Sequence, residues 1–144
     1  MSKPTPHTLG DYPHTLTIPT RWADNDIYGH VNNSVYYFYF DTVVNKWLIH
    51  NELLEVGTSE VVGLVVETSC SYFAPISFPD DVVAGLRVAK LGNSSVRYEI
   101  GLFRNDETEA SAQGHFVHVY VDEKTRRPVK ISDIMREKLT EILI

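Results

Sequence analysis

Two carboxylates that could do chemistry, Asp24 and Asp26, lie two positions apart just before a long apolar stretch. Residues two apart in an extended chain project to the same side, so we expect the pKa values of the two acids to separate. A carboxylate held as the anion can act as a general base or as a nucleophile. Gly29 follows shortly afterwards and allows a tight turn and the close approach of a ligand.

The segment from Ser34 to about Leu54 predicts a helix that would position these acids. Its first residues have strand composition, but it contains neither Gly nor Pro, and its polar residues recur at helical spacing: Ser34, Asp41, Asn45 and Glu52. The remaining surface is mostly apolar, so we expect a helix buried nearly all round, with Asn32 or Asn33 as N-cap. The free N–H groups at its start and the helix dipole can hold the developing oxyanion of a thioester.

Period-two alternation predicts five strands around this helix. The first is His14 to Trp22, in which Pro19 indicates an edge or a break. The others are Val61 to Phe73, Val82 to Val88, Val96 to Leu102 and Ala110 to Val121, with a hairpin at Gly92-Asn93-Ser94. Ser132 should cap a short closing helix whose apolar side is Ile134, Leu139, Ile142 and Leu143.

This order of elements predicts an α+β fold. We expect a curled antiparallel sheet of about five strands wrapped around one long central helix, with a short C-terminal helix. Residues 1–13 are expected to form a loose leader, and residues 14–144 a single domain.

The composition and net charge of the chain indicate which classes of binding partner are expected. The chain has 144 residues, 43% of them hydrophobic and 22% charged, which is typical of a globular protein. The formal net charge of -6 gives no basic footprint for nucleic acid. No apolar run approaches the roughly 18 residues of a membrane span. The segment from Met1 to Thr15 has no apolar core of the kind a signal peptide needs, so the expected location is the cytoplasm.

Several other chemistries have no signal in the sequence. His115 and His118 are three apart in a strand and should point to opposite faces, so they do not form a metal pair. No nucleophile elbow, zinc spacing or dinucleotide fingerprint occurs, and we expect neither a metal nor a cofactor. Cys70 is the single cysteine, and its place in a strand favours the role of a small buried hydrophobe.

The run from Arg21 to Tyr36, RWADNDIYGHVNNSVY, closely resembles the signature of the 4-hydroxybenzoyl-CoA thioesterase-like branch of the hotdog superfamily. The order of elements over residues 14–121 is also similar to that family. One departure concerns the helix, where Asp41 keeps an acidic residue of the family but Val44 replaces the Arg that often follows it. This difference affects the expected substrate pocket and leaves the Asp26 chemistry untouched.

The resemblance implies a thioesterase that hydrolyses an acyl-CoA to the free acid and CoA. It gives Asp26 the role of nucleophile or general base and the backbone N–H of Asn33 the role of oxyanion donor, in a loop that also contains Gly29, His30 and Asn32. It further implies a homodimer or homotetramer with active sites at subunit interfaces and CoA lying across the surface.

Alternatives remain for individual residues and for the activity. For Asp24 we favour a structural role, bonding loop amides. His30 could carry a proton, but we favour a role in orienting the loop. Asn32 could hold Asp26 or a water in place, and helix capping explains it equally well. Candidates for substrate contacts are Tyr36 at the acyl group and four basic residues at the CoA phosphates: Arg87, Lys90, Arg97 and Arg104. Two further functions stay open, an acyl-ACP thioesterase and a non-catalytic acyl-CoA-binding protein.

Overall fold

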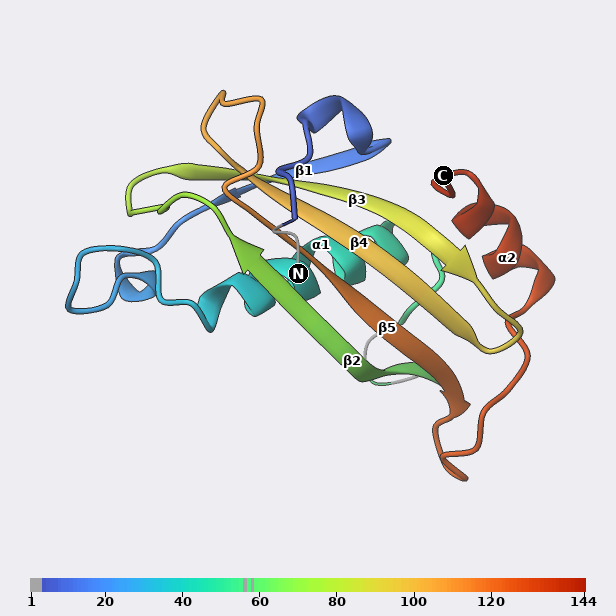
Figure 1. The fold of residues 1–144 in the computed structure, drawn as a ribbon. Coiled ribbons are helices and arrows are strands. Elements are labelled where there is room, and N and C mark those ends of the chain that lie inside the picture. Colours follow the sequence, from blue (N-terminus) through green and yellow to red (C-terminus); the bar gives the residue numbers. More distant parts are fainter. Residues whose placement is uncertain (1–3, 56, 58) are drawn as a thin grey trace.

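The computed structural model describes residues 4–55, 57 and 59–144 (Figure 1). Two short 3-10 helices, Leu9–Asp11 and Trp22–Asp24, flank the first strand. The regular elements follow in the order β1 (His14–Pro19), α1 (Val35–His50), β2 (Val61–Tyr72), β3 (Asp81–Leu91), β4 (Ser95–Arg104), β5 (Ala112–Asp122) and α2 (Asp133–Thr140).

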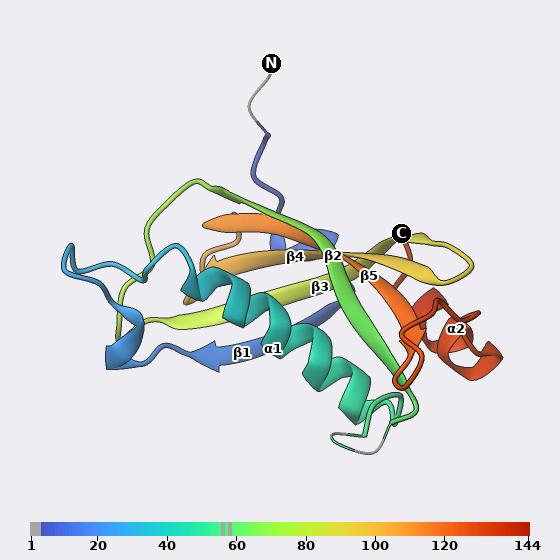
Figure 2. The same ribbon diagram turned by 90° about the horizontal axis from the view of Figure 1, so that it is seen from below.

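The five strands form one curled sheet in the order β1-β3-β4-β5-β2, and every neighbouring pair is antiparallel. The long helix α1 lies along one face of this sheet, as Figure 2 shows, while α2 closes the end near the C-terminus. The predicted hotdog fold is therefore confirmed. The edge position predicted from Pro19 is also confirmed, because β1 pairs with β3 alone.

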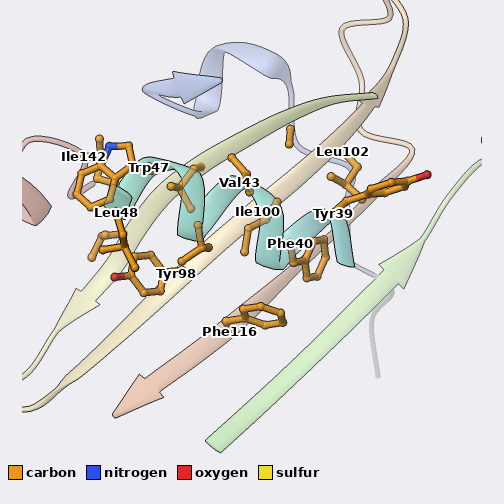
Figure 3. Close-up of a cluster of buried hydrophobic side chains, with 14 of the residues drawn as sticks. Tyr39, Phe40, Val43, Trp47, Leu48, Tyr98, Ile100, Leu102, Phe116 and Ile142 are labelled. Carbon is orange, nitrogen blue, oxygen red and sulfur yellow. The ribbon is translucent and has the colours of Figure 1, made fainter. Parts of the chain in front are cut away.

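The core lies between α1 and the concave face of the sheet. Figure 3 shows Phe40, Val43 and Leu48 of α1 packed against strand side chains such as Ile100 and Phe116. Each such buried aliphatic or aromatic side chain contributes about 1.5–3 kcal/mol. The four alternating residues expected on one face of β3, and the four on β4, are all fully buried: Val82, Ala84, Leu86, Val88, Val96, Tyr98, Ile100 and Leu102.

Helix α1 departs from the prediction in its burial and in both of its ends. Phe38 and Ile49 are exposed, so a single chain covers only one side of the helix. At the start, Ser34 is the N-cap without a side-chain bond, and Asn32 instead accepts from the Ser34 N–H in the preceding turn, at 3.0 Å. The end comes at His50 and not near Leu54, because the chain turns back there.

That turn is a Schellman motif. The N–H of Leu53 bonds to the Leu48 carbonyl at 2.8 Å, and the N–H of Glu52 bonds to the Ile49 carbonyl at 3.0 Å. Glu52 has φ 60°, the left-handed conformation that favours glycine. Nothing in the residue type at position 52 indicates this stop, so the sequence pattern overextends the helix.

The end of β1 and the apolar side of α2 also differ from the prediction. β1 ends at Pro19, and Trp22 lies in a 3-10 turn with its side chain exposed. Ser132 caps α2 as predicted, accepting from the Met135 N–H at 3.2 Å. Of the expected apolar side, Leu139 and Ile142 are buried, but Ile134 and Leu143 are exposed, and Met135 lies in the core instead.

The described part of the expected leader is held against the sheet. The Leu9 N–H bonds to the Thr108 carbonyl at 2.9 Å, and the His7 N–H bonds to the Gln113 side chain at 2.7 Å. Tyr12 is buried against Phe103. Local composition with three prolines suggested looseness, whereas these contacts come from residues about 100 positions away, which a local pattern does not reveal.

Candidate active site

The loop between β1 and α1 folds back on itself around Asp26. The Asp26 N–H bonds to the His30 carbonyl at 2.9 Å, and the Gly29 N–H bonds to the Asp26 carbonyl at 3.1 Å. Gly29 has φ 80°, so the turn uses the conformational freedom of glycine. These bonds fix the backbone from which the Asp26 side chain projects.

The same loop is anchored to the segment between β2 and β3. The Val31 N–H bonds to the Ile76 carbonyl at 2.7 Å, and the Ser77 hydroxyl donates to the Gly29 carbonyl at 2.9 Å. Asn25 accepts from the Phe78 N–H at 3.0 Å. The loop is thus positioned by residues about 50 places along the chain.

The Asp26 carboxylate is half-buried and keeps room for a further contact. One oxygen accepts from the Tyr28 N–H at 2.8 Å, and the other accepts no hydrogen bond from any described residue. The unoccupied oxygen is free to take a proton from water or to attack a carbonyl.

Asn33 stands at the turn that leads into α1, and its backbone N–H donates to no acceptor among the described residues. The Asn33 carbonyl is occupied, because the Tyr72 hydroxyl of β2 donates to it at 2.8 Å. Asn32 lies one residue earlier, its N–H bonded to the Asp24 carbonyl at 2.9 Å. A free amide beside the positive end of a helix can hold an oxyanion.

Asp24 has the structural role that the sequence favoured. Its side chain is 1% exposed and accepts from the Arg21 backbone N–H, the Arg21 guanidinium and the Tyr39 hydroxyl, each within 3.0 Å. Burial acts to raise the pKa of Asp24, but these donors outweigh it and hold the pKa below its usual value. The two acids therefore differ in their surroundings. Both oxygens of Asp24 accept hydrogen bonds from the protein, whereas one oxygen of Asp26 is free to contact a substrate or a water.

The predicted catalytic residues Asp26 and Asn33 lie outside the cleft beside the start of α1. This cleft of about 560 Å³ is lined by Asp24, Val35 and Phe38 among others. Ile27 and Tyr28, on the same loop, are 92% and 79% exposed, and the His30 side chain is exposed as well.

No group of three or more His, Cys, Asp or Glu side chains within the described residues is arranged to hold a metal ion. Within the same part of the chain, no helix has the length and hydropathy to cross a membrane.

Comparison with known proteins shows which family has this fold and sequence. Residues 20–139 match the family model of the thioesterase-like superfamily. The chain belongs to the thioesterase-like superfamily. With the hotdog fold described above, this makes it a thioester hydrolase.

Solved structures agree with this assignment. The thioesterase is similar to the PA5185 protein from Pseudomonas aeruginosa strain PAO1, with 51% identity, 96% of each chain covered and a TM-score of 0.93. It is also similar to a thioesterase from Thermus thermophilus that is complexed with coenzyme A and Zn, with 30% identity, 92% and 95% of the two chains covered and a TM-score of 0.76. No curated protein matches the sequence.

Three of the four basic residues expected at the CoA phosphates of the thioesterase are paired with acidic side chains of the same chain. Arg87 and Arg97 both pair with Glu99 on β4, at 2.8 and 3.3 Å, and Arg104 pairs with Asp80 at 2.8 Å. Lys90 makes no ion pair with any described residue.

Tyr36, expected at the acyl group, is buried in the first turn of α1. Its ring packs edge-on against Tyr72, with 4.9 Å between ring centroids. Sequence reasoning missed Tyr72, which links β2 to Asn33 and covers Tyr36. Only the pairing of β2 with the rest of the sheet brings it there, and no local pattern signals it.

A second arrangement that the sequence did not reveal lies on the outer face of the sheet. His115 stands between Ser69, 3.0 Å away, and Glu67, 2.8 Å away, because β2 and β5 pair in that register. None of the three lines the cleft beside α1. Cys70, next to Ser69, is half-buried, and burial raises the pKa of its thiol to about 11, which leaves it protonated and a poor nucleophile.

Proposed function

We propose that the thioesterase hydrolyses acyl-CoA, with Asp26 as general base or nucleophile and the Asn33 N–H as oxyanion donor. The observation that carries this proposal is the pairing of an available carboxylate with an unoccupied amide in one anchored loop at the start of α1. A site with so few catalytic groups suits a thioester. Resonance between the sulfur and the carbonyl is weak, so the carbonyl is already reactive toward attack.

Two routes to hydrolysis use these groups, one with Asp26 as general base and one with Asp26 as nucleophile. In the first, Asp26 takes a proton from water as the water oxygen adds to the carbonyl, the C–S bond breaks, and the proton passes to the departing CoA sulfur. In the second, the Asp26 carboxylate adds to the carbonyl and expels CoA thiolate, and water then hydrolyses the resulting anhydride. In each, the carbonyl oxygen becomes negative and rests on the Asn33 N–H, a contact whose loss typically costs about 10²–10³ in rate.

CoA is the favoured carrier. A related thioesterase from Thermus thermophilus binds coenzyme A. An acyl-ACP would present an acidic protein, and the formal net charge of -6 opposes its approach.

The active site is completed by a second copy of the chain, in a homodimer or a dimer of dimers. Three apolar side chains are exposed on the Asp26 loop and on the first turns of α1, namely Ile27, Tyr28 and Phe38. Nearby, β2 is the last strand of the sheet, and a partner could pair with its free edge. A partner there would also shelter the site that one chain leaves open.

The decisive experiment is Asp26→Asn, which keeps the size of the side chain and an oxygen for the Tyr28 N–H. We expect the release of CoA thiol to fall by two orders of magnitude or more across a broad acyl-CoA panel, with an unchanged circular dichroism spectrum. Asp24→Asn is the matched control, and its loss of turnover should be smaller. Hydrolysis by the Asp26 variant close to the wild-type rate would end the proposal.

Two further measurements separate the alternatives. Acyl-CoA and acyl-ACP compete in one assay, and preferential cleavage of acyl-ACP would overturn the choice of carrier. Tight binding of acyl-CoA by the wild-type protein without thiol release would make the chain a binding protein and contradict hydrolysis.

A further inference from the structure

A cavity of about 340 Å³ lies at the far end of α1 from Asp26. Its walls come from the end of α1, the start of β2, the end of β5 and the segment leading into α2, and include Leu48, Leu53, Val62, Ile131 and Met135. Asn45, which also lines it, is twelve residues along the chain from Asn33, or about 18 Å at the rise of an α-helix. The volume falls within the range of small-molecule sites.

The polar part of this lining includes Glu52 and Lys130, which are exposed, and one buried ring whose nitrogens have no hydrogen-bond partner among the described residues. The ring belongs to His118 of β5, which is 4% exposed. The nearest hydroxyls do not serve it, because those of Tyr98 and Tyr120 bond to each other at 2.7 Å. Buried polar atoms normally have partners, so a side chain with two unpartnered nitrogens beside open space points to a ligand.

The strand opposite His118 leaves its ring accessible from the cavity. Gly63 of β2 also lines the cavity, and a Cβ at that position would lie 2.8 Å from Nδ1 of His118. Any larger residue would therefore cover the nitrogen. The glycine keeps open the approach to the one buried side chain of the cavity wall whose polar atoms lack a partner among the described residues.

The chemistry of the ring defines what it can recognise. Burial lowers the pKa of His118 to about 4, so at neutral pH the imidazole is uncharged and offers one N–H donor and one nitrogen acceptor. A hydroxyl group matches this, since it too both donates and accepts. The two charged residues of the lining, Glu52 and Lys130, are exposed, so an ionised ligand at the buried imidazole would lose its hydration without a counter-charge from the ring.

We propose that this cavity is a second binding site, for an uncharged molecule with an apolar body and one hydroxyl group that hydrogen-bonds to the His118 imidazole. The inference does not depend on the roles proposed for Asp26 and Asn33.

Cyclohexanol is a suitable probe, titrated into the full-length ¹⁵N-labelled protein at neutral pH. Long-range ¹H–¹⁵N spectra report each histidine ring separately. We expect a saturable shift of the His118 ring nitrogens with no comparable shift at His30 or His115. Methylcyclohexane has the same shape without the hydroxyl and should bind about 10-fold more weakly, as expected for one lost hydrogen bond. No saturable change at His118, or equal binding of the two probes, would overturn the proposal.

His118→Phe tests the role of the ring, because it keeps an aromatic side chain and removes both nitrogens. The variant should bind the two probes equally, while its melting curve shows that it is folded. Gly63→Ala is a second variant that should weaken cyclohexanol binding by covering Nδ1. Retention of the alcohol preference in both folded variants would contradict the assignment of His118.

The location is tested by hydrolysis. Saturating cyclohexanol should leave KM and kcat for acyl-CoA unchanged, because the cavity lies far along α1 from Asp26. A rise in KM at constant kcat would show that the alcohol competes with the acyl chain and would reject a separate site.

Discussion

At the scale of single residues, two acids of the same type two positions apart have different surroundings. Asp24 accepts three kinds of donor and is buried, whereas Asp26 is half-buried with one oxygen unoccupied. The sequence predicts that the two should differ and favours a structural Asp24, because both follow from spacing and motif. The partner that distinguishes them, Tyr39, is one turn into α1 and becomes visible only in the structure.

Asp24→Asn should therefore act on stability more than on catalysis. The amide loses the charge-assisted bonds to Arg21 but can still accept from Tyr39, so we expect the free energy of unfolding to fall by about 1–3 kcal/mol at pH 7. The pKa of Asp24 is lowered in the folded state, so this contribution is present above its usual pKa and is lost as the pH falls further. Urea unfolding at pH 7 measures the effect, and an unchanged midpoint would contradict it.

His118 should make the free energy of unfolding depend on pH in the acid range, because the buried imidazole resists protonation in the folded state. Its pKa is 6.5 when unfolded and about 4 when folded, so between these values the unfolded chain binds the extra proton. Stability should fall by about 3 kcal/mol as the pH drops from 6.5 to 4. Tyr98 and Tyr120 face the ring and stay neutral in this range, because burial raises the pKa of each.

The measurement compares urea unfolding of wild type and His118→Phe at several pH values. Acids elsewhere titrate in both proteins, so the difference between the two curves isolates the imidazole. Parallel curves from pH 7 to 4 would show that His118 does not titrate differently in the folded state.

At the scale of elements, the sequence pattern predicts the type and order of the five strands and the two α-helices, but it misses both 3-10 helices. It fails where a boundary depends on backbone geometry. The apolar pattern continues through Leu53 and Leu54, yet α1 ends at His50, because Leu53 folds back on Leu48 in the Schellman turn. The contacts of the N-terminal segment could not be predicted for a different reason. Their partners lie far away in the sequence, where a local pattern carries no information.

Glu52→Gly should stabilise the protein, because Glu52 occupies the left-handed conformation at the end of α1. Glycine adopts the left-handed conformation without the steric cost that Glu52 has there. This gain exceeds the entropy that glycine adds to the unfolded chain, so we expect the free energy of unfolding to rise by about 1 kcal/mol. The midpoint of urea unfolding should rise with an unchanged slope. Glu52→Ala is the control, since it removes the same carboxylate and keeps the unfavourable conformation, and an equal gain in both variants would refute the explanation.

At the scale of the whole molecule, the candidate site is only partly contained in the sequence motif. The Asp26 loop and the start of α1 are contiguous, so a motif can specify them. Tyr72 reaches Asn33 from β2, and Ile76 and Ser77 hold the loop from the segment after it. Such contacts follow from sheet register and chain path, which no short pattern encodes.

The exposed edge leads to the last prediction, a dimer formed through β2. Val66 is 61% exposed on this strand, and Val61, Leu64 and Val65 are exposed as well. A long apolar edge left open invites pairing with a second chain, and in a two-fold dimer the same surface patch of both copies forms the interface. Val66→Lys would place one charge from each copy in this apolar interface, so we expect light scattering to change from dimer or tetramer toward monomer.

Activity should fall with assembly in that variant, because one chain leaves the Asp26 loop open. Ile144→Lys is the matched control, since it places the same charge on an exposed apolar residue at the C-terminus, and it should preserve both assembly and turnover. A wild-type protein that is monomeric at micromolar concentration, or a monomeric Val66 variant with full turnover, would show that each chain holds a complete site.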